Sequence, residues 1–363
     1  MPHKSPEPIA KCLIVSILLL ASFAAKAQNR EPSAAPDSSV RIFAVPLVYF
    51  SPDTYWAFGG AGILTFRGRP QRSSISFSGA YTQRKQILIS LPYQWFSPKG
   101  HWRAYGEVAW YRYLYQYFGI GNDYPNDFKE TYVAKYPRIR INALHRLRKH
   151  EMAGLRYGLD VFRILSIQEG GELASGMITG TGGGVSSAFG PVWLYDSRDN
   201  QFYPRSGGMI ESTVFAEIPL WGSDFRYLRF FTEASRYLSF WKKNVLVLHF
   251  LGQATIGDPP FFSMAQMGGA RWLRGYPAGK FRDKHLLLFQ TEWRFPLLWR
   301  FKGALFAGAG SVFGTPGERL LWRYNAGGGI RFEFDTRQHI HLRLDYGLGA
   351  DNSGFYLTVG EAF

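Results

Sequence analysis

Short segments along most of this chain alternate apolar and polar side chains with a period of two. In "GIRFEFD" (329–335), three apolar side chains share one face and three charged side chains share the other. The segments "RIRINA" (138–143), "LLLFQTEWRF" (286–295) and "HIHLRLDYG" (339–347) show the same alternation. A period of two predicts β-strands that each bury one face. Beyond the first 27 residues, no apolar run reaches the ~18 residues that a membrane-spanning helix needs.

The polar face of these strands distinguishes two classes of β protein. A soluble β-sandwich has an aliphatic buried face and a mixed outer face, whereas here the polar face carries charges of both signs in strand after strand. Aromatic residues make up 17% of the chain. Outer-membrane barrels place apolar side chains towards lipid, polar ones towards the lumen and aromatic ones at the interfaces. We therefore predict an all-β fold, a transmembrane outer-membrane β-barrel.

The lengths of the connections agree with a barrel of about 16 antiparallel strands, an even number as in bacterial single-chain barrels. With both termini in the periplasm, the long connections 116–131, 166–183 and 258–284 all lie on the extracellular side. The periplasmic turns, such as "SPKGH", "RKHE" and "DTRQ", are mostly short. The predicted strands are 41–50, 55–67, 72–82, 85–97, 101–115, 132–148, 150–165, 184–195, 207–219, 224–240, 244–257, 285–298, 301–313, 323–335, 338–349 and 354–363.

The start of the chain is typical of an exported protein. Lys4 and Lys11 precede the apolar run "CLIVSILLLASFAA", and "AKA" ends at residue 27, which predicts a signal peptide over 1–27 rather than a membrane anchor. Residues 28–40 are polar and rich in Ser and Pro, so we expect a flexible periplasmic lead-in. Residues 41–363 then form one barrel domain in the bacterial outer membrane.

The net charge and the cysteine content limit the kinds of partner and chemistry that we expect for this chain. The only cysteine, Cys12, leaves with the signal peptide, so the mature chain has no thiol chemistry. Cleavage lowers the formal net charge from +15 to +13. For an exported chain, a basic balance points to acidic surfaces, here outer-membrane lipid and lipopolysaccharide, and not to nucleic acid.

Motifs in four places carry a resemblance to a known family. Within the basic, glycine-rich stretch 268–284, the residues Leu273, Arg274, Gly275 and Tyr276 resemble the (V/I/L)-R-G-(F/Y) motif of BamA/TamA-type outer-membrane barrels, the bacterial surface antigen superfamily. The segment "YFGIGND" (117–123) is similar to a loop found in this group. The family's D-x-R-D-x-x-x-x-P-x-x-G turn is matched by Asp196, Arg198, Asp199, Pro204 and Gly207, and its C-terminal assembly signal by Phe355, Leu357, Val359 and Phe363.

This resemblance implies that the sixth extracellular loop folds into the lumen, where its arginine pairs with an acidic side chain. A planar guanidinium suits bidentate pairing with a carboxylate. An exposed basic loop that contacts lipopolysaccharide is the alternative. The family's F-x-D-x-G pattern after this loop has Gly308 in place of the acid, so the substitute partners that we consider are the lumen-facing Glu292, Glu333 and Asp345.

The family's assembly factors carry periplasmic POTRA domains before the barrel. About a dozen residues separate the predicted signal peptide from the first predicted strand, so the chain resembles members that lack these domains. A full assembly role therefore does not carry over with the resemblance.

Enzymatic motifs are lacking: the sequence has no G-x-S-x-G, H-E-x-x-H or Walker loop. We read "HIH" (339–341) as lumen-facing polar residues and "GTGGGVSS" (180–187) as the entry to a strand or a loop hinge. We read the acids at 196 and 199 as turn caps. We therefore predict no enzyme activity, cofactor or metal site.

Three functions stay open. The first is a barrel that assists insertion or translocation of a client polypeptide or lipid at the outer membrane, through a weak seam between the first and last strands. Pro46 in the first strand agrees with a weak seam, because proline cannot donate to a β-ladder. The second is a loop-gated pore with a basic lumen. The third is a structural barrel that forms a homo-oligomer or partners a separate periplasmic protein.

Overall fold

The computed structural model describes residues 40–51, 55–66, 73–125, 127–241, 243–336 and 339–363. The predicted signal peptide (1–27) and, apart from Val40, the predicted lead-in (28–40) lie outside the described residues. No helix among the described residues is long and apolar enough to cross a membrane.

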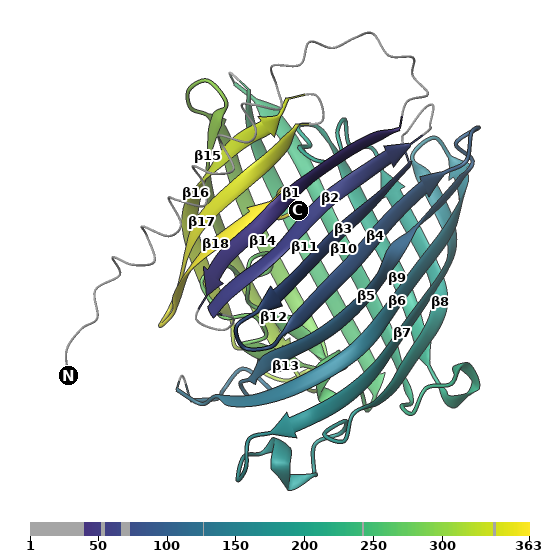
Figure 1. The fold of residues 1–363 in the computed structure, drawn as a ribbon, viewed down its shortest axis with the longest axis vertical. Helices are drawn as coiled ribbons and strands as arrows, with labels where there is room; N and C mark the ends of the chain where they lie inside the picture. The colour runs from purple at the N-terminus through teal and green to yellow at the C-terminus, as the bar shows by residue number, and fades with distance from the viewer. Residues whose placement is uncertain (1–39, 52–54, 67–72, 126, 242, 337–338) are drawn as a thin grey trace, which may run out of the picture.

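A single sheet of sixteen strands forms the fold, and every strand is antiparallel to its neighbours (Figure 1). The hydrogen-bonded order follows the chain, which confirms the predicted barrel architecture. Figure 1 shows the strands inclined and wrapped around a common axis. They are β1 (Arg41–Ser51), β2 (Tyr55–Phe66), β3 (Ser73–Thr82), β4 (Ile87–Phe96), β5 (Trp102–Tyr117), β6 (Glu130–Arg148), β7 (Glu151–Ile167), β8 (Gly184–Asp196), β9 (Gly207–Glu217), β10 (Tyr227–Phe240), β11 (Asn244–Gly257), β14 (His285–Pro296), β15 (Phe301–Phe313), β16 (Arg323–Asp335), β17 (Ile340–Gly349) and β18 (Ser353–Val359).

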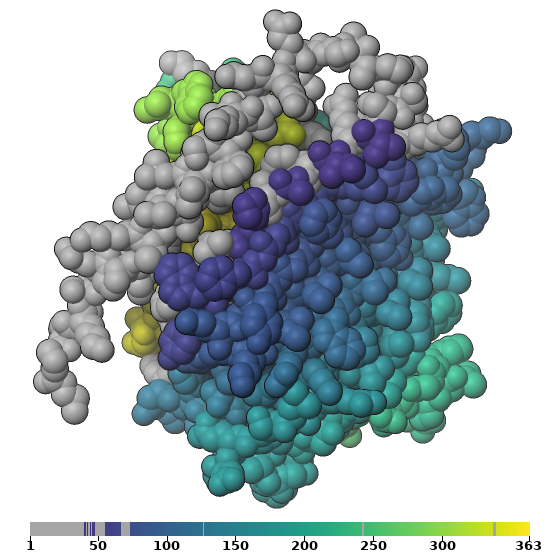
Figure 2. All heavy atoms as spheres, in the orientation of Figure 1, coloured from purple at the N-terminus to yellow at the C-terminus, as the bar shows by residue number. Residues whose placement is uncertain are grey.

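The alternation of side chains along each strand separates lipid from lumen. On β14, Gln290 and Glu292 are buried in the lumen, whereas Phe289 and Trp293 are 50% and 43% exposed on the outer face. Figure 2 shows the outer face over β2 to β7 as a continuous layer of side chains. Pairing with a strand on each side satisfies the backbone polar groups of β2 to β17, as a lipid environment requires.

The two ends of the described sheet are the strands with one paired neighbour each. Among the described residues, β1 pairs only with β2 and β18 pairs only with β17. The last strand is shorter than predicted: it ends at Val359 and does not reach 363. Gly360 has a φ of +86°, which breaks the extended backbone, and the residues after it turn into the lumen.

The extracellular connections contain short elements that the alternation did not predict. A 3₁₀ turn, η1 (Leu173–Ser175), lies in the connection after β7, and another, η2 (Pro219–Trp221), lies after β9. The connection 258–284, called loop six below, contains η3 (Phe261–Ser263) and a separate hairpin of β12 (Ala265–Met267) and β13 (Phe281–Asp283).

Candidate functional site

Loop six is packed inside the barrel by its apolar side chains. Met267 and Leu273 have 0% exposed surface, and Phe281 has 5%. They form one cluster with side chains of the inner wall on β11, β14 and β15, namely Leu251, Leu286, Leu288 and Val312. Full burial of one such side chain is worth about 1.5–3 kcal/mol. Loop six is therefore a folded segment that packs inside the lumen.

Arg274, at the centre of loop six, donates to two acidic side chains of the wall. Its Nη2 lies 2.7 Å from Glu292 Oε2 on β14, and its Nη1 lies 2.5 Å from Asp345 Oδ2 on β17. All three side chains are fully buried. The guanidinium carbon lies 3.5 Å from the centroid of the Phe306 ring, so an aromatic face covers the cation. One loop side chain thus bridges strands on both sides of β15 and β16.

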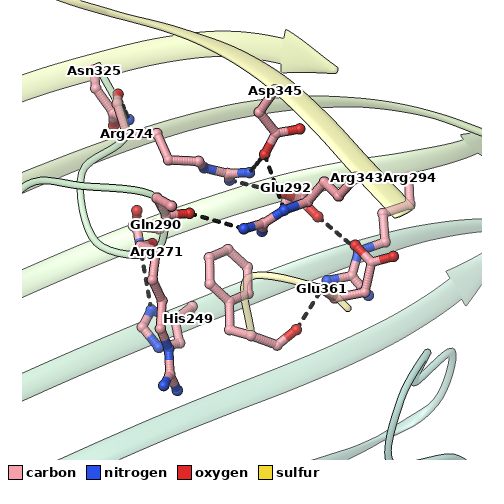
Figure 3. Close-up of polar contacts among 12 residues, drawn as sticks. His249, Arg271, Arg274, Gln290, Glu292, Arg294, Asn325, Arg343, Asp345 and Glu361 are labelled. Carbon is pink, nitrogen blue, oxygen red and sulfur yellow. Dashed lines mark hydrogen bonds and ion pairs between the residues drawn. The ribbon is translucent and has the colours of Figure 1, made fainter. Parts of the chain in front are cut away.

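Three further arginines complete a buried ionic network around the same acids, and Figure 3 labels two of them, Arg294 and Arg343. Arg343 Nε lies 3.5 Å from Asp345 Oδ2. Arg331 Nη1 lies 2.5 Å from Asp345 Oδ1 and its Nη2 lies 3.2 Å from Glu292 Oε2. Arg294 Nε lies 2.8 Å from Glu292 Oε1. Buried charges persist only when they are paired and hydrogen-bonded, and here each carboxylate has several cationic partners.

The backbone of the motif approaches the wall so closely that only glycine fits. Gly275 has a φ of +118°, and a Cβ there would lie 2.6 Å from the carbonyl carbon of Leu348. On the wall, a Cβ at Gly347 would lie 2.7 Å from the carbonyl carbon of Arg274. The Gly275 amide donates to the Tyr356 hydroxyl of β18 at 2.9 Å, so the motif is also bound to the last strand.

The structure brings Arg274 together with two of its three candidate partners. Glu333 lies elsewhere: Lys302 Nζ is 3.4 Å from its Oε2, and His339 Nδ1 is 2.6 Å from its Oε1. At Gly308, the family's acidic position, a Cβ would lie 2.7 Å from Asn325 Oδ1, so a side chain there would require Asn325 to shift. Asn325 instead donates to the carbonyl oxygen of Arg274 at 2.6 Å.

The segment 117–123 contacts the second half of loop six. The amide of Gly121 donates to the carbonyl oxygen of Arg282 at 2.7 Å. Asn122 Nδ2 donates to Ser311 Oγ at 2.9 Å and to the carbonyl oxygen of Val312 at 2.7 Å. Two motifs more than 100 residues apart therefore meet at the extracellular end of the lumen.

The periplasmic turn after β8 has its own ion pair and caps. Arg198 donates from Nε and Nη2 to the two carboxylate oxygens of Asp196, at 2.9 and 2.7 Å. Asp199 Oδ1 accepts from the amides of residues 200, 205 and 206, a capping arrangement. Pro204 is buried, and a Cβ at Gly207 would lie 2.1 Å from the carbonyl oxygen of Ser197.

This turn also places Tyr203 beneath the ionic network. Its ring centroid lies 4.5 Å from that of His341, and Lys302 Nζ lies 4.0 Å from the Tyr203 ring centroid. Burial raises the pKa of its phenol. The tyrosine ring packs against His341, Lys302 and Arg294, contacts that its position within the motif gave no reason to expect.

The C-terminal residues occupy both faces of the wall. Phe355 and Val359 are 66% and 65% exposed on the outer face of β18, and Leu357 is half-buried. Phe363 lies in the lumen, where its ring stacks on that of His249 at 4.5 Å between centroids. Its carbonyl oxygen accepts from Arg294 Nη2 at 3.0 Å.

The sequence did not identify five members of this site: Tyr203, Arg294, Arg331, Arg343 and Glu361. Glu361 Oε2 lies 3.5 Å from Arg331 Nε and 3.7 Å from Arg294 Nε. The lumen-facing parity of the three arginines was visible in the alternation, but nothing local showed that they share acids with loop six. Among the described residues, no group of three or more His, Cys, Asp or Glu side chains is placed to hold a metal ion.

Comparisons with known proteins give the family and the fold. The Omp85 superfamily domain matches residues 65–363, and no curated protein matches. BamA from Haemophilus ducreyi lacking POTRA domains 1-3 is 15% identical with a TM-score of 0.59, over 95% of this chain and 78% of that one. CdiB from Escherichia coli is 13% identical with a TM-score of 0.60, over 90% of this chain and 63% of that one. CdiB from Acinetobacter baumannii is 13% identical with a TM-score of 0.56, over 90% of this chain and 60% of that one.

At these identities, the solved structures show a shared barrel fold and no more. This chain covers less than two thirds of the length of the two CdiB chains. The family match, in contrast, extends from the end of β2 to Phe363 and includes loop six and the periplasmic turn. The chain belongs to the Omp85 superfamily.

Proposed function

We propose that this outer-membrane barrel assists the insertion or translocation of polypeptide or lipid, and that loop six is an internal latch on the strands next to the seam. The observation that carries the proposal is the pairing of Arg274 with Glu292 and Asp345 at full burial. Through this one side chain, loop six holds β14 and β17 from within.

The position of the latch relative to the seam supports this function. The seam strands have a limited capacity for pairing, because β1 contains Pro46 and β18 spans only Ser353–Val359. The loop backbone also accepts from Tyr356 of β18, whose hydroxyl donates to the carbonyl oxygen of Tyr276 at 3.0 Å. Release of the latch would therefore loosen the last strand and the lumen together, as lateral insertion or passage of a client requires.

The test uses the chain itself as the client. Urea-unfolded, fluorescently labelled protein is added to liposomes with or without prefolded protein, and folding is followed by the change in gel mobility between unheated and boiled samples. We expect the prefolded protein to accelerate folding and Arg274→Ala to lose most of that acceleration. Equal folding rates with and without prefolded protein would exclude an insertion function for this client.

A pore is the second candidate, because the lumen contains a polar cavity of about 350 Å³. Its lining includes Arg138, Arg140 and Arg229 beside Asp160 and Glu217. A pore with a generic basic lining would tolerate Arg274→Lys in both loop protection and conductance, and Arg274→Ala would alter only anion selectivity in bilayer recordings. That combination of results would favour the pore over the latch.

A further inference from the structure

Three basic side chains form a row across the outer wall of β5, β6 and β7. Arg112 lies directly opposite Lys135, and Lys135 lies directly opposite Arg163. Arg112 and Arg163 are exposed and Lys135 is half-buried. In the part of the chain that the structure describes, none of the three has an ion-pair or hydrogen-bond partner for its side chain.

The side chains next to this row show that it faces away from the lumen. Tyr111, Tyr136 and Phe162 precede or follow the three basic residues and point inward. The Tyr111 ring packs at a tilt against Tyr136 at 5.4 Å between centroids, and Tyr136 stacks on Phe162 at 4.6 Å. Phe162 in turn stacks on Phe262 of loop six at 4.1 Å. Because successive side chains of a strand point to opposite faces, the basic row lies on the outer surface.

The row lies at the extracellular edge of the apolar band. Outward positions of β5 from Trp102 to Trp110 carry apolar side chains, close to the ~9–11 residues of a tilted membrane strand. Arg112 is the next outward position towards the extracellular end. Tryptophans typically mark the interfaces of such barrels, and outward arginine or lysine costs little there. The strands β5 to β7 lie side by side on the face turned to the viewer in Figures 1 and 2.

Like charges directly opposite each other on neighbouring strands are destabilising. Side chains at such positions have Cβ atoms only about 5 Å apart, so three cations lie within roughly 10 Å of one another. An anion with several closely spaced negative charges removes this repulsion. We propose that Arg112, Lys135 and Arg163 bind the phosphate groups of lipid A, the phosphorylated glycolipid of the outer leaflet.

The depth and the grouping of the charges favour lipid A over a phospholipid. The row lies towards the extracellular end of the barrel, the end from which loop six enters the lumen. It therefore faces the outer leaflet, which contains lipopolysaccharide. The exposed aromatic and aliphatic wall below it, including Trp110 and Val108, is placed to contact acyl chains. The proposal does not depend on an insertion function, since it concerns only the outer wall.

Native mass spectrometry of the folded protein in a neutral detergent tests this site with bis-phosphorylated lipid A as the probe. Each cation near an anionic lipid surface is worth about 1 kcal/mol. We therefore expect each single substitution to glutamine to weaken binding about fivefold, and Arg112→Gln/Lys135→Gln/Arg163→Gln together to weaken it roughly 100-fold. Lipid A should also raise the unfolding temperature of the wild type and not that of the triple variant.

Arg236→Gln is the matched control. Arg236 is exposed on the outer face of β10, towards the periplasmic end, and lies opposite Leu248 and Gly208 with no second cation beside it. This variant should bind lipid A like the wild type. All variants should keep the heat-dependent gel mobility of the folded barrel, because none of the substituted side chains has a protein partner within the described residues.

Two comparison ligands separate the sources of phosphate. Dephosphorylated lipid A should bind at least tenfold more weakly, and millimolar inorganic phosphate should not displace lipid A. The proposal is overturned if the triple variant binds lipid A like the wild type, if phosphatidylglycerol binds as tightly as lipid A, or if inorganic phosphate competes.

Discussion

Replacing Arg274 by alanine removes the one loop side chain that reaches both wall acids. Breaking a buried ion pair by removing one partner costs about 3–5 kcal/mol. The lower value applies here, because Glu292 keeps Arg294 at 2.8 Å and Asp345 keeps Arg331 at 2.5 Å. We therefore expect loop six to lose about 3 kcal/mol of local stability. Lysine keeps the charge but lacks the planar fork, so it should lose one charged hydrogen bond, about 1.5–2 kcal/mol.

Limited proteolysis of residues 268–284 in the folded, detergent-solubilised protein measures this loss. When opening and closing are fast relative to cleavage, the cleavage rate follows the population of the open loop. A loss of about 3 kcal/mol then raises the rate about 150-fold, and the loss of about 1.5–2 kcal/mol in the lysine variant raises it about 10- to 30-fold. The gel mobility of unheated samples must stay that of the folded barrel throughout.

Arg271→Ala is the control for this measurement. Arg271 lies in the same loop and pairs with Glu233, but its side chain is 49% exposed. Such pairs contribute about 0–1 kcal/mol, so cleavage should rise by less than about fivefold. Equal cleavage rates for Arg271→Ala and Arg274→Ala, or wild-type protection in Arg274→Lys, would refute a latch that depends on the buried guanidinium fork.

Three further changes test the contacts around the latch. Gly347→Ala should expose loop six to protease as Arg274→Ala does, because its Cβ would lie 2.7 Å from the loop backbone, whereas Gly182→Ala, with open space around it, should not. Tyr203→Ala should destabilise the barrel by about 3 kcal/mol and raise its bilayer conductance from the periplasmic side, and unchanged conductance would show that the ring does not close the lumen. Deletion of Phe363 should lower the folded yield in gel-mobility assays, because its ring loses the stacking on His249; an unchanged yield would count against an assembly role for this end of the chain.

The barrel could be predicted from the sequence because its physical cause is local. Alternation between lipid-facing and lumen-facing side chains repeats within each strand, so a segment such as 329–335 shows both faces without reference to the rest of the chain. The boundaries were least accurate where a single backbone angle decides them. The last strand ends at Val359 because Gly360 adopts a positive φ, which alternation alone does not reveal.

The ionic network depends on contacts between residues far apart in the chain. Arg274 and Asp345 are 71 positions apart, and they meet only after the sheet curls and loop six packs between its walls. The motif identified Arg274, but three acidic residues shared the inward parity. Only the register of β14 to β17 places two of these acids beside the loop and the third, Glu333, beside Lys302.

The same reason explains the basic row. Arg112, Lys135 and Arg163 are separate outward positions in the sequence, and only the pairing of three long strands makes them direct neighbours. The sequence by itself determined which side chains face lipid and which face the lumen, because that depends on a period of two. Only the tertiary structure decided which of them meet, because that depends on strand register and on where the sixth loop packs.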